Sequence, residues 1–268
     1  MSPTLSPRAA RVVAVFGLAL QLARRDLRNR YLGSFSGGAW ALVQPLVQLA
    51  VYSFVFGYIF RQRLPGADAP GYVPFLVVVL WPWTAFSEAV SRATTAIQDN
   101  ASLIGKVALP RSALVLAPVL ASFAVHGVGY FGLLLVLLVV GAGIAPAGLL
   151  AMLPAFALLF LFALGLALLL SALQVFVRDI APALPQLLML WMFLSPVFYG
   201  RYVMPEAVRP WFDLNPMTGF AEYLRFVLLG TAAPGWSTLA CSLAGVTVAV
   251  AAGGFAFRRL QRHFEDFL

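Results

Sequence analysis

The chain alternates long apolar stretches with short charged segments over its whole length. About six of the stretches approach or exceed the ~20 residues that an α-helix needs to cross ~30 Å of hydrocarbon. Of the 268 residues, 62% are hydrophobic and only 10% are charged, with a mean hydropathy of +0.90. A soluble domain has about 25% charged residues. The sequence therefore predicts an all-α integral membrane protein, with one transmembrane domain over residues 1–268.

We expect six transmembrane helices and one polar outer region. The spans are expected at residues 36–60, 72–97, 113–140, 149–176, 182–199 and 236–257. Residues 201–230, between the fifth and sixth spans, carry charges and prolines among short apolar pieces. A lipid-exposed span would not tolerate these charges. This region is expected to form re-entrant or surface helices packed against protein or a water-filled cavity.

Residues 12–31 run from a short apolar segment into a block of arginines at Arg24, Arg25, Arg28 and Arg30. The apolar part is too short to span a bilayer, and no small-residue cleavage site of a signal peptide follows it. We expect an amphipathic helix in the cytosolic interface, with the arginines toward lipid phosphates. A simple positive-inside anchor and a gating role both fit this helix.

The basic residues predict the orientation of the chain. The expected outer segments hold five of the 18 Lys and Arg residues, which are Arg61, Arg63, Arg201, Arg209 and Arg225, and the cytosolic segments hold the other thirteen. An excess of Lys and Arg marks the cytosolic side, so both termini are expected inside. Because the formal charge of +8 is spread over short loops, it predicts contact with the membrane surface and no nucleic-acid partner.

The first expected span carries polar and aromatic side chains at helical spacing. Trp40, Gln44, Gln48 and Tyr52 recur at every fourth residue and therefore share one face. Amides at membrane depth need a partner or water. This face is expected either to line a lumen or to pack against another helix.

We expect no motif of this sequence to serve catalysis, nucleotide binding or metal binding. The run GVGYFG (127–132) matches the dinucleotide pattern GxGxxG by letter, but it follows no expected strand and lies inside an expected span. The patterns GxxxxGK[ST] and GxSxG are absent, and the two histidines and the single Cys241 form no ligand cluster. We therefore expect no catalytic site, no metal and no cofactor in this chain. If the protein moves a substrate against a gradient, it needs either a separate ATPase subunit, which would carry ATP and Mg, or an ion gradient.

Several short motifs occur in a fixed order along nearly the whole chain. They are RRDLRNRY (24–31), GAWALVQPL (38–46), VFG (55–57), the loop at residues 100–111, VRDI (177–180), LSPV (194–197) with Tyr199, NPM (215–217) and FRR (257–259). In this order they resemble the permease subunits of type-2 ATP-binding-cassette exporters of polysaccharides. That family moves O-antigen, teichoic acid and capsule chains, so the resemblance implies export of a lipid-linked polysaccharide.

The resemblance also implies an assembly and three groups of site residues. The assembly is a homodimer with two copies of a cytosolic ATPase subunit, in a bacterial inner (cytoplasmic) membrane. A gating helix would contain Arg24, Arg25, Arg28, Arg30 and Tyr31. A coupling helix at residues 99–111 would contact the ATPase through Asn100, Leu103, Ile104, Lys106 and Arg111. The channel lining would include Trp40, Gln44, Gln48, Tyr52, Trp191, Phe193, Phe198 and Tyr199, whose rings suit the faces of sugars.

Three other functions fit parts of the sequence. An exporter of a small hydrophobic compound would share the fold. An ion-coupled secondary transporter could use Glu88 and Arg92, which are spaced to pair on one helix face, but no inverted repeat is visible. A membrane-bound biosynthetic enzyme would need a cluster of carboxylates or histidines at one membrane face, and none can be assembled. Polysaccharide export is the function we expect.

Overall fold

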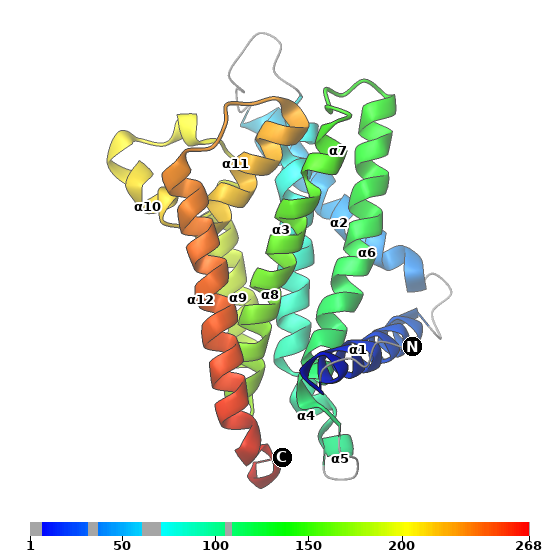
Figure 1. Cartoon of the computed structure of the whole chain (residues 1–268). Coiled ribbons are helices and arrows are strands. Elements are labelled where there is room, and N and C mark those ends of the chain that lie inside the picture. The colour runs from blue at the N-terminus through cyan, green and yellow to red at the C-terminus, as the bar shows by residue number, and fades with distance from the viewer. Residues whose placement is uncertain (1–6, 32–36, 61–70, 105–108, 268) are drawn as a thin grey trace, which may run out of the picture.

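The computed structural model describes residues 7–31, 37–60, 71–104 and 109–267, and within these ranges the chain is helical and has no β-strand (Figure 1). Four helical stretches are long and apolar enough to cross a membrane. They are α3 (Tyr72–Thr94), α6 (Arg111–Val139), α7 (Gly148–Ala151) with α8 (Leu153–Gln174), and α12 (Trp236–Leu260) with η4 (Gln261–Asp266). The expectation of an all-α membrane protein is confirmed for the described residues.

Two further apolar helices are shorter than these four. They are α2 (Gly37–Tyr52), which continues into the π-helical segment η1 (Ser53–Ile59), and α9 (Ile180–Phe193). Figure 1 shows α3, α6, α8 and α12 running side by side, with α2 and α9 beside them. The number of six spans therefore stays a prediction.

The helix expected over residues 182–199 ends earlier than predicted. α9 stops at Phe193 because Pro196 has no N–H to donate and its ring disfavours the helical conformation for Ser195. Carbonyls of the turn that follows α9 accept hydrogen bonds from other elements. Tyr72 Oη donates to Phe198 O at 2.9 Å, Arg225 NH2 donates to Val197 O at 2.8 Å and Asn215 Nδ2 donates to Leu194 O at 3.2 Å.

The coupling helix expected over residues 99–111 is two short helices where the structure describes it. α4 (Ala96–Asp99) and α5 (Ala101–Ile104) have four residues each. Asn100 separates them because its Nδ2 donates to Ala96 O at 2.8 Å, which competes with helix continuation. Residues 105–108, with the predicted Lys106, lie outside the described residues.

The N-terminal helix is longer than expected and crosses the bundle. α1 (Pro7–Tyr31) has 25 residues, and Figure 1 shows it lying across α6 near the end of the bundle that carries α4 and α5. Its buried Ala23 packs against Ala117 and Ala121 of α6, and such small side chains allow a close approach of two helices. The position of α1 in a membrane interface stays a prediction.

The polar region at residues 201–230 forms short helices at the opposite end. They are η2 (Arg201–Val203), η3 (Glu206–Val208), α10 (Arg209–Asp213) and α11 (Pro216–Leu229). Asn215 caps α11 by accepting a hydrogen bond from Met217 N at 3.0 Å. Whether these helices re-enter the membrane stays a prediction.

Glycines bring α8 and α12 into backbone contact. A Cβ on Gly253 would lie 2.0 Å from Gly165 O, and a Cβ on Gly165 would lie 2.5 Å from the carbonyl carbon of Ala249. Real Cβ atoms do not come this close to backbone atoms. Ala249 and Gly253 of α12 thus form its close contact with α8.

We predict that Gly253→Ala destabilises the protein because the added methyl overlaps the α8 backbone, at a cost of about 1–3 kcal/mol. Gly254→Ala is the matched control, because the nearest atom to its added Cβ is Arg258 NH2 at 4.0 Å. Alanine is also the better helix former by about 1 kcal/mol. Thermal unfolding in detergent should show a lower midpoint for Gly253→Ala only, and equal midpoints would contradict the packing described.

Candidate functional site

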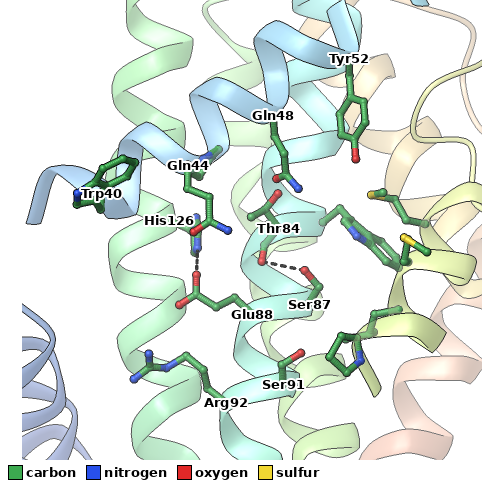
Figure 2. Close-up of a pocket in the computed structure, with 16 residues that line it drawn as sticks. Trp40, Gln44, Gln48, Tyr52, Thr84, Ser87, Glu88, Ser91, Arg92 and His126 are labelled. Carbon is green, nitrogen blue, oxygen red and sulfur yellow. Dashed lines mark hydrogen bonds and ion pairs between the residues drawn. The ribbon is translucent and has the colours of Figure 1, made fainter. Parts of the chain in front are cut away.

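A cavity of about 650 Å³ lies between α2, α3 and α9 (Figure 2). α9 forms its apolar side with Pro185, Leu188, Met189 and Met192. α2 and α3 supply amides, hydroxyls and charges on the other sides. A space with one apolar wall and several fixed polar groups is typical of a site that binds a small molecule or one segment of a longer chain.

The face of α2 that carries the predicted stripe borders this cavity. Trp40, Gln44, Gln48 and Tyr52 all line it, and Figure 2 shows them following one another along α2. The structure therefore brings these four predicted residues to one wall. Their contact with a substrate stays a prediction.

The face of α3 that borders the cavity is a second polar stripe, which the sequence analysis did not predict as a lining. Its members are Thr84, Ser87, Glu88, Ser91 and Arg92. Spacings of three, four and seven residues place them on one side of the helix. The recurrence of hydroxyl groups and charges at helical spacing within an apolar span could have indicated from the sequence that this face lines a cavity.

Glu88 is bound by two side chains of α6. His126 Nε2 lies 2.6 Å from Glu88 Oε2, and the Ser122 hydroxyl donates to Glu88 Oε1 at 3.3 Å. The His126 side chain is 2% exposed, and Glu88 keeps 27% of its side chain exposed. Across the described residues, no group of three His, Cys, Asp or Glu side chains could hold a metal ion.

Arg92 connects the cavity wall to the N-terminal helix. Its NH2 lies 2.6 Å from Asp26 Oδ2 of α1. The spacing in the sequence suggested a pair between Glu88 and Arg92, but the structure gives each of them an ionic partner on another helix. Arg92 therefore joins the cavity to α1, which carries the predicted gating arginines.

A second hollow of about 410 Å³ adjoins Arg92 on the side of α1. It is lined by residues of α1, α3, α4 and α6, and by the two residues that flank α4. Arg25 from the predicted gating group and Asn100 from the predicted coupling group both border it. Arg24 and Arg28 are exposed, and the side chains of Arg30 and Tyr31 lie outside the described residues.

An aromatic cluster lies where η1, which continues α2, meets the turn after α9. The Tyr52 ring lies 4.8 Å from the Phe198 ring, which stacks on Phe56 at 4.9 Å and lies 5.1 Å from Phe193. Phe198 is fully buried. The predicted Tyr52, Phe193 and Phe198 are thus brought together, and Tyr199 lies beside them with its hydroxyl donating to Phe193 O at 2.5 Å.

Trp191 lies away from the cavity. Its ring makes edge contacts with Trp83, Phe86 and Phe162, and its Nε1 donates to Asn215 Oδ1 at 3.0 Å. Met189 and Met192 line the cavity from the same helix. The sequence analysis predicted Trp191 as a lining residue because of its ring. Since α9 is apolar around most of its circumference, the sequence does not determine which face of α9 borders the cavity.

The segment predicted to couple to an ATPase, and the helix α4 that leads into it, are held by contacts with other helices of the chain. Gln98 of α4 and Gln174 of α8 bind each other, and Ala181 N donates to Gln174 Oε1 at 2.8 Å. Ile104 is buried, Leu103 is half-buried, and Arg111 binds Gln261 O and Glu265 of the C-terminal η4. Arg111 is therefore engaged within the chain itself.

Comparison with known proteins assigns the class. Residues 18–229 match the ABC-2 type transporter family, and the chain belongs to this family. It is similar to the O-antigen export system permease protein RfbA of Myxococcus xanthus, with 29% identity over 93% of this chain and 95% of the relative. RfbA of Klebsiella pneumoniae is 26% identical over 76% of each chain. The polysialic acid transport protein KpsM of Escherichia coli is 24% identical over 82% of each.

We predict that Asp26 and Arg92 stabilise the contact between α1 and α3 jointly. Both side chains are about one third exposed, so solvent limits their coupling to about 0.5–1 kcal/mol. Thermal unfolding of Asp26→Asn, Arg92→Gln and the double variant forms the cycle that measures it. The double variant should lose less unfolding free energy than the two single variants lose in sum. Additive losses would mean that the pair does not couple the helices.

Proposed function

We propose that this chain is the transmembrane subunit of an ATP-driven exporter that moves a lipid-linked polysaccharide across a bacterial inner membrane. The observation that carries the proposal is the cavity between α2, α3 and α9, with amides and hydroxyls on two walls. Sugar hydroxyls need such partners, and the apolar faces of sugars suit aromatic rings. The similarity to O-antigen permeases over nearly the whole chain supports this reading of the cavity.

The proposed membrane arrangement has six spans. α2 and η1 together cover Gly37–Ile59, which is long enough to cross, while the 14 residues of α9 reach only about 21 Å and need the turn that follows. α1 would lie in the cytosolic interface, with both termini inside. η2, η3, α10 and α11 would form the re-entrant region on the outer side.

The proposed assembly is a homodimer with two ATPase subunits. The α2 residues that line the cavity also border a third hollow, of about 380 Å³, together with Val47 and Val51. Val47 and Val51 are exposed, as are Leu187 and Leu190 of α9. A second copy packed on these apolar faces would enclose the cavity and continue it into a channel.

Coupling to the ATPase is proposed for the segment at residues 99–111, which begins at the last residue of α4 and includes α5. ATP and Mg would bind to the partner subunit. A movement of α4 would reach α8 and the start of α9 through Gln98 and Gln174, and it would reach α1 through Arg92 and Asp26. The cavity wall would then shift with each ATPase cycle, because α3 and α9 both belong to it.

We predict that Ser102→Arg on the exposed surface of α5 disrupts docking of the ATPase without disturbing the core. Surface glycan and recovery of the ATPase with the tagged chain should both fall about tenfold or more, a loss of at least about 1.4 kcal/mol in docking. Co-purification from cells that express the neighbouring genes, with immunodetection of the glycan, measures both.

Glu206→Arg is the matched control for this experiment, because Glu206 is 90% exposed and lies in the outer region at the opposite end of the bundle. It should leave both quantities unchanged. Glycan export by a chain that purifies without any ATPase, and that responds to a proton gradient, would refute the proposed function.

A further inference from the structure

We propose that Glu88 is a specificity-determining residue that makes the cavity a binding site for uncharged glycan segments and excludes glycans with a negative charge on each sugar. The inference rests on the proposed export function and names the substrate class of the same cavity. Neither the family nor the relatives' names decide between these classes, because O-antigen and polysialic acid permeases both resemble this chain.

The carboxylate of Glu88 is fixed at the cavity wall. His126 and Ser122 bind it from α6, and the Glu88 side chain remains partly exposed while His126 is buried. Figure 2 shows the carboxylate between Gln44 and Arg92, on the side of the cavity. A carboxylate makes short, charge-assisted hydrogen bonds with hydroxyl donors, roughly twice as strong as those of a neutral acceptor.

Among the described residues, the lining of the cavity offers no unpaired cation to an anion. Arg92 is the only arginine or lysine among the described residues that line it. Its NH2 lies 2.6 Å from Asp26 Oδ2. Glu88, Asp26, Arg92 and His126 together carry a charge of −1 with a neutral imidazole and 0 with an imidazolium. Neither of these two ion pairs therefore carries excess positive charge in either state of His126, and Arg25 borders the adjoining hollow instead of this cavity.

The other polar groups of the described lining are neutral. They are the amides of Gln44 and Gln48 and the hydroxyls of Tyr52, Thr84, Ser87 and Ser91. Such groups can exchange hydrogen bonds with sugar hydroxyls in either direction. A sugar carboxylate would lose hydration here without gaining a cation, and it would approach Glu88 as a like charge. Discrimination thus comes from repulsion of the wrong substrate as well as from attraction of the right one.

The test uses the complete transporter, this chain with its ATPase, in lipid nanodiscs. The probes are a neutral oligosaccharide, maltoheptaose, and oligosialic acid of matched length, with binding followed by tryptophan fluorescence. The wild type should bind the neutral probe about tenfold or more tightly than the anionic one. Glu88→Lys should reverse this preference, because the wall then carries excess positive charge.

Two further variants keep the test decisive. Glu88→Gln preserves the shape of the side chain, and it should bring the affinity ratio of the two probes at least about threefold closer to one through loss of the charge. Glu206→Lys, far from the cavity, should leave the ratio unchanged. If Glu88→Lys does not assemble, Glu88→Gln decides the outcome alone.

The outcomes separate the inference from the proposed function. Equal binding of both probes by the wild type, or a ratio that neither Glu88 variant changes, overturns the inference and leaves polysaccharide export standing. Binding of neither probe by the wild type overturns both.

Discussion

A polar or charged side chain within hydrocarbon costs several kcal/mol unless it finds a partner or water. This constraint explains the arrangement of α2, α3 and α6. Glu88 is bound by His126 and Ser122, Arg92 is bound by Asp26, and the amides of α2 face the cavity. The polar groups are thereby collected on one side of α3, and a cavity that can hold water or sugar follows from that arrangement.

The remaining helices hold this wall in place. α8 and α12 approach to backbone contact at Gly165 and Gly253, and α3 packs between α6 and α8. At the other end, the guanidinium of Arg225 lies 3.6 Å from the centre of the Phe75 ring and donates to the turn after α9. That turn carries Phe198, whose ring meets Tyr52. The region at residues 201–230 is thus connected to the cavity through fixed contacts.

The sequence predicted the long helices well because each is a mainly apolar run long enough to cross a bilayer. It also placed Trp40 to Tyr52 on one face, since spacing alone determines the face of a helix. It could not predict that Glu88 pairs with His126 instead of Arg92, because residues four apart always satisfy helical spacing and the competing partner lies on another helix. The same limit applies to Trp191, whose direction depends on how α9 rotates against α3.

The most direct measurement is photocrosslinking in cells that synthesise the glycan, with a photoreactive residue at Gln48 of the cavity wall. The account predicts a crosslinked band that reacts with antibody to the glycan and disappears when glycan synthesis is blocked. Val128 of α6, which is 77% exposed, is the comparison and should give no such band. Crosslinking at Val128 but not at Gln48 would place the glycan outside the cavity and contradict the account.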